Sequence, residues 1–453
     1  MTPEHGRILT FSNAPARHGE AGDGELAEAL NDSAPVAMIG WELGAGEGHL
    51  ARMVPIVRAL RERGWTVIAA VRDVARARSI LGPVGGCAGP GRFVLGQAPI
   101  FLHRAPVSGA CASLGEILSI TGFGDAKLIA PVLRAWISLL ERFKPDVAIS
   151  DAAPTLNVAA RGRAPVVTIG NGWTIPPEMD PLPPLLREHY GQASAIAAEQ
   201  RICKAFTLAS GKRIESAAGT LRGEANFVCT APPLDPYADY RSDTLYWPPE
   251  VEIPPRAGQR SGPALIYLPK GHPAIDAVLA AVAVCGDQAQ GYFGGSAKTG
   301  PPSVSVASHP LDFAALMPQA PYIIHHGGLG TANYALALGV PQLVLPTDLE
   351  KMLIGRGVER VSAGLTARPD RSAAAYAGSL QALSGRTAEA SYFDSDRDGA
   401  ATVDVLMGAV AALSMRGAEA RRAAETGGRE TTVLIEGNCE ALVRGRVVAG
   451  EAA

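Results

Sequence analysis

The sequence predicts an α/β protein with two domains, each built around a parallel β-sheet. Three observations support this expectation. The chain has 453 residues, which is more than one ordinary hydrophobic core accommodates. The order strand, glycine-rich turn, helix, strand occurs in both halves of the chain, and this is the order of a βαβ unit. A segment rich in proline and charge separates the halves at residues 236–261, as expected of an interdomain linker.

The first half opens with a strand at residues 36–39, which runs into a glycine cluster at 44–48. A helix is expected from 49 to 63, because its apolar residues recur at helical spacing: Leu50, Met53, Val54, Val57 and Leu60. Gly64 ends this helix, and residues 65–71 form the next strand. This is one complete βαβ unit.

The remaining first half continues the pattern, with a helix at 128–142 and strands at 145–150 and 165–169. Residues 36–235 are therefore expected to form the first domain. Residues 1–35 carry many charges and no apolar run, so we expect them to be a mobile extension and not a signal peptide.

The second half repeats this organisation. It begins with a strand and a helix, followed by two weaker strands, a third strand, a glycine turn, a helix and a final strand. The ranges are 264–268, 274–284, the vicinity of Gly291, 303–306, 322–324, 332–338 and 342–345. Residues 262–390 are expected to form the second domain. Residues 391–453 are expected to hold a helix at 403–413 and a tail.

The composition narrows the classes of partner and site that are expected of this protein. The formal net charge is -3, whereas a nucleic-acid-binding protein is expected to be basic, so we expect no nucleic-acid partner. The six cysteines include no CxxC pair, which indicates neither a zinc site nor a redox dithiol. No apolar stretch reaches the roughly 20 residues of a membrane span. We expect a cytoplasmic protein whose membrane contact is at most peripheral.

The strongest local signal is the segment HHGGLGT at 325–331, between an expected strand and an expected helix. Glycines let the backbone approach an anion closely, and the following helix offers unpaired N–H groups and a positive dipole end. His326, Gly328, Gly330 and Thr331 are therefore candidates for binding a diphosphate. The alternative is an ordinary glycine-rich turn with a core histidine.

Two longer segments resemble the UDP-glycosyltransferase superfamily, the family 1-like glycosyltransferases. HHGGLGTANYALALGVPQLVLP at 325–346 is similar to the family's signature, and GEGHLARMVPIVRALRERGWTVIAA at 46–70 is similar to its first turn, helix and second strand. The resemblance implies a GT-B fold, in which two Rossmann-like domains face each other across a cleft. It also implies that the C-terminal domain binds the donor nucleotide and the N-terminal domain the acceptor. His326 matches the family's phosphate-contacting histidine, while His325 is expected to point into the packing of the strand.

The chain departs from the family pattern at the donor site. The family usually has a ribose-binding glutamate where this sequence has Tyr334, and an Asp-Gln pair where it has Glu350 and Lys351. We expect these three residues to contact a donor, although the departures leave its identity open. The resemblance adds two further candidates. His309 lies near the family's base-stacking aromatic position, and Lys270 follows the first strand of the domain, where a diphosphate contact and a solvated side chain are equally expected.

The resemblance gives the N-terminal histidine a catalytic role. Residues 44–48 read G-x-G-x-G like a dinucleotide fingerprint, but the position for its third glycine is His49. In the family this histidine is the general base, and imidazole accepts protons near neutral pH. Asp151 follows a later strand and is the expected partner of His49, with Asp125 as a rival. The alternatives are a surface histidine at a helix end and an aspartate that caps a helix.

The function expected from these features is inverting transfer of a sugar from a UDP- or TDP-sugar to a small natural-product or lipid-like acceptor. Asn171 and Trp173 are expected on the acceptor side, unless Trp173 is ordinary core. No metal and no cofactor are expected, because the helix N-terminus and hydrogen bonds meet the diphosphate charge. Two other functions stay open: a sugar-nucleotide epimerase or hydrolase of the same fold, and a non-catalytic auxiliary protein.

Overall fold

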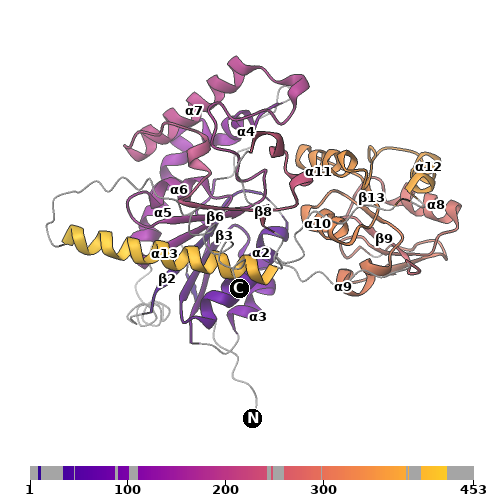
Figure 1. The fold of residues 1–453 in the computed structure, drawn as a ribbon, viewed down its shortest axis with the longest axis horizontal. Coiled ribbons are helices and arrows are strands. Elements are labelled where there is room, and N and C mark those ends of the chain that lie inside the picture. The colour runs from indigo at the N-terminus through magenta and orange to yellow at the C-terminus, as the bar shows by residue number, and fades with distance from the viewer. Residues whose placement is uncertain are drawn as a thin grey trace, which may run out of the picture. The chain divides into compact units, whose positions relative to one another are not determined.

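The computed structural model describes residues 9–11, 34–44, 46–86, 90–101, 111–241, 246–247, 260–296, 298–383, 386 and 399–425. Contacts divide the chain into two compact units, the first comprising Met1–Val228 with Ala401–Ala453 and the second Cys229–Ala400. Each unit contains a parallel sheet with helices packed on it, as the sequence predicts (Figure 1).

The first sheet has eight strands in the order β1-β4-β3-β2-β5-β6-β7-β8. Their bounds are β1 (Leu9–Phe11), β2 (Val36–Trp41), β3 (Thr66–Val71), β4 (Phe93–Gln97), β5 (Val147–Asp151), β6 (Val166–Gly170), β7 (Ala225–Cys229) and β8 (Tyr246–Trp247). The central strands β3 and β5 are buried along their whole length. Such continuous apolar runs are typical of parallel strands covered on both faces.

The helices of the first unit are α2 (Gly48–Glu62), α3 (Val74–Gly85), α4 (Leu114–Leu118), α5 (Ala126–Phe143), α6 (Pro154–Ala160), α7 (Gln192–Ser210) and α13 (Gly399–Glu425). Helix α2 presents Leu50, Met53, Ile56, Val57 and Leu60 to the core. The predicted apolar positions therefore lie on its buried face except Val54, which is only partly buried. Helix α13 returns to this unit, where Arg63 at the end of α2 bonds to Asp404 at 3.0 Å.

The second sheet has six strands in the order β11-β10-β9-β12-β13-β14. Its strands are β9 (Ala264–Tyr267), β10 (Ala289–Tyr292), β11 (Val304–Ala307), β12 (Ile323–His325), β13 (Gln342–Val344) and β14 (Gly364–Thr366). Its helices are α8 (Ile275–Cys285), α9 (Phe313–Leu316), α10 (Leu329–Leu338), α11 (Leu349–Arg360) and α12 (Ala373–Leu383). All neighbouring strands in this sheet pair in parallel, so the carboxyl ends of the strands share one edge.

Three segments differ from the expected domain plan. Leu9–Phe11, inside the expected extension, pairs in parallel with β4. In the expected linker, Tyr246 and Trp247 form β8, and the Tyr246 hydroxyl donates to buried Asp235 at 2.7 Å. The expected C-terminal helix extends to Gly399–Glu425. The rest of 1–35 except 34–35, most of 236–261, and residues 391–398 and 426–453 lie outside the described residues.

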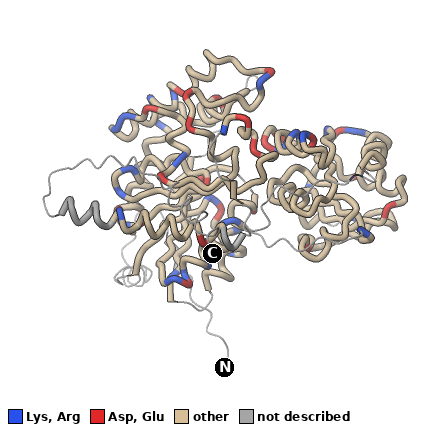
Figure 2. Tube along the Cα trace, in the orientation of Figure 1, with Lys and Arg blue, Asp and Glu red and all other residues tan. Residues whose placement is uncertain are grey.

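Charge is distributed without a dominant sign. Figure 2 shows Lys and Arg interspersed with Asp and Glu on both units, and the described residues gather no extended basic stripe. Within the same residues, no helix has the length and apolar character needed to cross a bilayer.

Candidate active site

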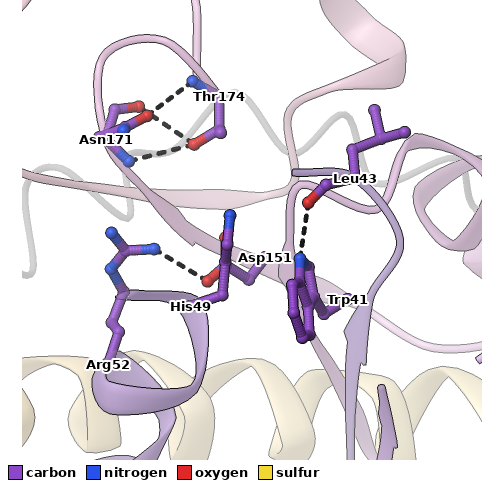
Figure 3. Close-up of polar contacts among 7 residues, drawn as sticks. All are labelled: Trp41, Leu43, His49, Arg52, Asp151, Asn171 and Thr174. Atoms are coloured by element: carbon purple, nitrogen blue, oxygen red, sulfur yellow. Dashed lines mark hydrogen bonds and ion pairs between the residues drawn. The ribbon is translucent and has the colours of Figure 1, made fainter. Parts of the chain in front are cut away.

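His49 and Asp151 meet at the carboxyl edge of the first sheet. His49 is the second residue of α2, and Asp151 is the last residue of β5. Strands β2 and β5 are neighbours, with Trp41 in register with Asp151, so the turn after β2 carries His49 to the end of β5. The His49 Nδ1 and the Asp151 Oδ1 lie 2.9 Å apart (Figure 3). The rival carboxylate, Asp125, instead caps α5 by accepting the Lys127 N–H at 2.8 Å.

Asp151 is held in its anionic form. Burial by itself would raise the pKa of Asp151, but the charges and hydrogen bonds of His49 and Arg52 hold that pKa below its ordinary value. An ionised carboxylate only accepts hydrogen bonds, so the His49 Nδ1–H donates to it. The neutral ring then has its lone pair on Nε2, and the His49 side chain is 16% exposed. This arrangement fixes a histidine tautomer that is able to accept a proton at Nε2.

An aromatic ring and a glycine confine the imidazole. The Trp41 ring stacks on His49 with centroids 5.0 Å apart and planes at 21°. The Trp41 Nε1–H donates to the Leu43 carbonyl at 2.6 Å, and the Leu43 N–H donates to the Ala152 carbonyl at 3.0 Å. Gly44 has φ +87°, and a Cβ there would lie 2.5 Å from the His49 Nε2. Only glycine tolerates both the conformation and the approach.

Glu42 joins the two loops that carry the pair. Its side chain is buried and accepts N–H bonds from Thr155 at 3.1 Å and Leu156 at 2.7 Å, in the first turn of α6. Its carbonyl accepts from the Arg72 guanidinium at 2.7 Å. Burial raises the pKa of Glu42 to about 8, although the two amides favour its charged form. Glu42 was not a candidate from the sequence, because its partners lie more than 100 residues away along the chain.

The glycine loop of the second unit forms a separate site. His325 ends β12 and is fully buried; its Nε2–H donates to the Gln342 Oε1 at 2.9 Å, and its Nδ1 accepts from the Gly327 N–H at 3.2 Å. Burial lowers the pKa of His325 to about 3. His325 is therefore a neutral structural residue that shapes the loop, in line with the expectation that it points into the strand packing.

His326 lies in the loop between β12 and α10, beside a glycine and a hydroxyl. A Cβ on Gly328 would lie 3.2 Å from the His326 Cε1 and 3.8 Å from the Thr331 Oγ1. The His326 Nδ1 is buried and has no hydrogen-bond partner within the described part of the chain. Burial, followed by the charge of Lys351, lowers the pKa of His326 to about 4. The ring is thus a neutral hydrogen-bonding group at neutral pH.

Lys351 borders the same loop. Gly327 has φ +92°, and a Cβ there would lie 2.9 Å from both the Cβ and the carbonyl of Lys351. The Lys351 Nζ pairs with Asp348, the N-cap of α11, at 2.8 Å, and Glu350 lies in the first turn of that helix. The loop and the first turn of α11 therefore form one surface with a lysine beside the neutral histidine.

Known proteins that are similar to this chain indicate what kind of protein carries these two sites. Residues 295–393 match the family described as Erythromycin biosynthesis protein CIII-like, C-terminal domain. The chain is 29% identical over 345 residues to the elloramycin glycosyltransferase of Streptomyces olivaceus, covering 71% of this chain and 84% of the relative. It is 29% identical over 342 residues to the L-demethylnoviosyl transferase of Streptomyces niveus, covering 71% and 82%. The chain is a glycosyltransferase, and it is similar to the family 1-like enzymes.

The fold comparison agrees. A structure of the spinosyn rhamnosyltransferase SpnG with spinosyn aglycone superposes with a TM-score of 0.54 at 19% identity, over 86% of this chain and 99% of that one. A further structure of that protein holds thymidine diphosphate. The expected fold class, α/β with the GT-B arrangement of two Rossmann-like domains, is confirmed, as is the expectation of an enzyme that transfers a sugar.

The other donor-side candidates of this glycosyltransferase have different surroundings. Lys270 is exposed, and its backbone packs so closely on Gly294 that a Cβ there would lie 2.5 Å from the Lys270 N. His309 is exposed. Tyr334 is 5% exposed and lies in an apolar cluster, with the Phe313 ring centroid 6.2 Å away. Phe313, rather than His309, is thus the residue whose ring lies near Tyr334.

His272 was missed by the sequence analysis. Its Nε2–H donates to the Leu345 carbonyl at 3.0 Å, and its Nδ1 accepts from the Ala274 N–H at 3.3 Å, so it ties the loop after β9 to the end of β13. Burial lowers the pKa of His272. His272 lies two residues after the candidate Lys270, but nothing local in the sequence indicated its partner.

The expected acceptor-side residues lie in one turn of the first unit. The Asn171 Oδ1 accepts the Thr174 N–H at 2.9 Å, and the Thr174 Oγ1 accepts the Asn171 N–H at 3.1 Å (Figure 3). Asn171 thereby closes its own turn, which follows β6. Trp173 projects from the same turn and is half-buried.

Proposed function

We propose that this glycosyltransferase moves a sugar from a TDP- or UDP-sugar to a hydroxyl group of a small natural-product acceptor, with inversion at the anomeric carbon. The pair of partly buried His49 and buried Asp151 carries the proposal, because it supplies a base with a fixed tautomer. The similarity to the elloramycin and demethylnoviosyl enzymes, and to SpnG with its aglycone, supports an acceptor of this class.

In the proposed reaction the acceptor O–H bond breaks and its proton passes to the His49 Nε2. The acceptor oxygen attacks the anomeric carbon from the face opposite the diphosphate. The bond from that carbon to the diphosphate oxygen breaks, and its electron pair stays on the diphosphate. Asp151 stabilises the imidazolium that forms.

The glycine loop is proposed to hold the departing diphosphate. The N-terminus of α10, the Thr331 hydroxyl and the neutral His326 offer hydrogen bonds, and Lys351 adds a positive charge. Glu350 is proposed to accept hydrogen bonds from the sugar. We propose that these groups suffice without a metal, so turnover should survive EDTA; its complete loss, restored by Mg²⁺, would contradict this.

The decisive experiment compares His49→Ala with the control His189→Ala, which removes an exposed histidine of the same unit. We expect His49→Ala to lower turnover of a weakly acidic alcohol by roughly 10²–10⁴-fold, the usual contribution of general-base catalysis. Its affinity for TDP should be unchanged. Asp151→Asn should lose less, and a strongly acidic phenol should partly rescue His49→Ala because it ionises unaided. A wild-type rate in His49→Ala would refute the role.

The same assay separates the rival functions. Consumption of TDP-glucose or UDP-glucose at full rate without an acceptor would favour an epimerase or hydrolase. Nucleotide binding without any turnover would favour an auxiliary protein. His326→Ala should weaken TDP binding, measured by calorimetry, while Asp276→Asn, which changes an exposed residue of the same unit, serves as the control.

A further inference from the structure

Arg52 bonds to the oxygen of Asp151 that His49 leaves open. Its Nη1–H donates to the Asp151 Oδ2 at 2.8 Å, while His49 donates to Oδ1 (Figure 3). The Arg52 side chain is 12% exposed and Asp151 is fully buried. His49 and Arg52 are three residues apart on α2, so both side chains project from the same face of the helix. One carboxylate is thus shared between an imidazole and a guanidinium.

The guanidinium has two physical effects on this pair. Because it stays charged at every accessible pH and bonds directionally, it holds the carboxylate ionised and in one orientation. Because its positive charge offsets that of Asp151, an imidazolium at His49 gains less from the carboxylate than it would from an uncompensated anion. The first effect orients the histidine, and the second weakens the attraction of the carboxylate for a positively charged ring.

The other groups around His49 do not supply the orienting and electrostatic effects of Arg52. Trp41 contributes an uncharged ring from β2. Glu42, at the end of the same strand, is buried, and burial raises the pKa of Glu42 to about 8, so it is largely protonated at neutral pH. Arg72 bonds to the Glu42 carbonyl, and Glu47, in the turn before α2, is exposed and lies 4.0 Å from Arg76. Of the groups named here, Asp151 and Arg52 are charged and bond to each other directly beside His49.

We propose that Arg52 is a positioning residue that fixes Asp151 against His49 and limits the proton affinity of the histidine, so that His49 is ready to act as a base at neutral pH. The inference rests on the proposed role of His49. It predicts that removing the guanidinium leaves His49 protonated at pH values where the native enzyme has it neutral.

The first measurement needs no turnover. In the full-length protein labelled on its nine histidines, NMR follows each imidazole against pH, and the His49 signal is identified by its absence in His49→Gln. In Arg52→Met the His49 titration midpoint should rise by on the order of one pH unit, the scale of a neighbouring charge. Arg52→Lys restores a cation and should return the midpoint toward the native value. Arg63→Met breaks the exposed ion pair between Arg63, at the end of α2, and Asp404 of α13, and should leave the midpoint unchanged.

The second measurement is the pH profile of kcat/KM with TDP-glucose and a phenol acceptor. The acidic limb should move to higher pH in Arg52→Met by the same interval as the NMR midpoint. Activity should then be lower by up to about tenfold on that limb, by less at neutral pH, and should recover in alkaline buffer. An unshifted midpoint in Arg52→Met would overturn the inference. So would a raised acceptor KM with an unmoved profile, which would make Arg52 a substrate-binding residue. If the midpoint shifts while His49→Ala stays fully active, the proposed base function fails and the electrostatic control by Arg52 stands.

Discussion

Replacing Glu42 by glutamine should remove a large pH dependence from the stability of the first unit. Burial raises the pKa of Glu42 from 4.5 to about 8. The folded protein therefore binds this proton more tightly than the unfolded chain does. The stability contributed by protonated Glu42 is complete below about pH 4.5 and is lost as the pH rises through about 8. Glutamine carries no titrating proton, so the variant lacks this slope.

The magnitude follows from the shift. A difference of about 3.5 pH units corresponds to about 5 kcal/mol over the whole range, at about 1.36 kcal/mol per unit. Between pH 5 and pH 7 the same linkage gives a loss of about 2.5 kcal/mol in the wild type relative to Glu42→Gln. The amide of the variant has a partner, since the neighbouring Thr155 Oγ1 has no other hydrogen bond among the described residues.

Urea unfolding followed by tryptophan fluorescence measures the effect, because Trp41 and Trp136 are buried in the same unit. Glu116→Gln is the matched control. Glu116 also accepts two backbone N–H bonds, from Ala112 and Ser113, at 2.8 and 3.1 Å. Burial by itself would raise the pKa of Glu116, but hydrogen bonds from the Ser194 hydroxyl and these amides hold that pKa below its ordinary value. The stability that ionised Glu116 contributes is therefore lost only as the pH falls through this lowered pKa. The difference in stability between the wild type and Glu116→Gln should be flat from pH 5 to 7.

Parallel wild-type and Glu42→Gln stability curves over this interval would refute the reasoning, since they would mean that Glu42 is already ionised in the folded protein. A difference of opposite sign would mean that the two amides of α6 outweigh the burial of the carboxyl.

Three further predictions concern the loops and the donor. Gly44→Ala should lower turnover at least tenfold with TDP affinity unchanged, because its Cβ would occupy the space at the His49 Nε2. Gly46 has φ +102° and no heavy atom within 4 Å of a Cβ built there, so Gly46→Ala should show only the effect of backbone strain. Equal kinetics in the two variants would contradict the steric argument. Gly327→Ala should weaken TDP binding, because its Cβ would collide with Lys351; unchanged affinity by calorimetry would mean that the loop relaxes without cost. TDP and UDP should bind within about one tenfold step, about 1.4 kcal/mol, because buried Tyr334 offers no carboxylate to a ribose 2′-hydroxyl; a stronger preference for UDP would require another reader of that group.

The fold was predictable where the pattern is local. The apolar spacing of α2 and the buried runs of β2, β3 and β5 follow from periodicity. The short strand β14 and the weakly amphipathic α12 give too few periodic residues for recognition. The return of α13 to the first unit depends on contacts such as Arg63–Asp404, which are distant in the sequence and have no local signature.

The contacts of the candidate site were likewise predictable where they follow from the geometry of one helix or of neighbouring strands. The contact between His49 and Asp151 follows from two neighbouring parallel strands, whose carboxyl ends share one edge. Arg52 was within reach of the same reasoning, because a residue three positions after His49 lies on the same helical face. Glu42 and Trp41 were not, since their roles depend on the loop at 151–156 and on a ring stacking that the spacing does not encode.

The proposed base site and the proposed nucleotide site lie in different compact units, so their roles can be tested separately. The groups that orient and tune the base lie in residues 41–156, within the first unit, and the glycine loop with Lys351 lies in the second. Substitutions at His49, Gly44 or Arg52 should therefore change kcat and its pH dependence without changing the affinity for TDP. Substitutions at His326 or Gly327 should change that affinity without shifting the pH profile, because burial lowers the pKa of His326 to about 4, below the working range. A variant of the first set that weakened TDP binding as strongly as it lowered turnover would show that the base site and the nucleotide site are energetically coupled.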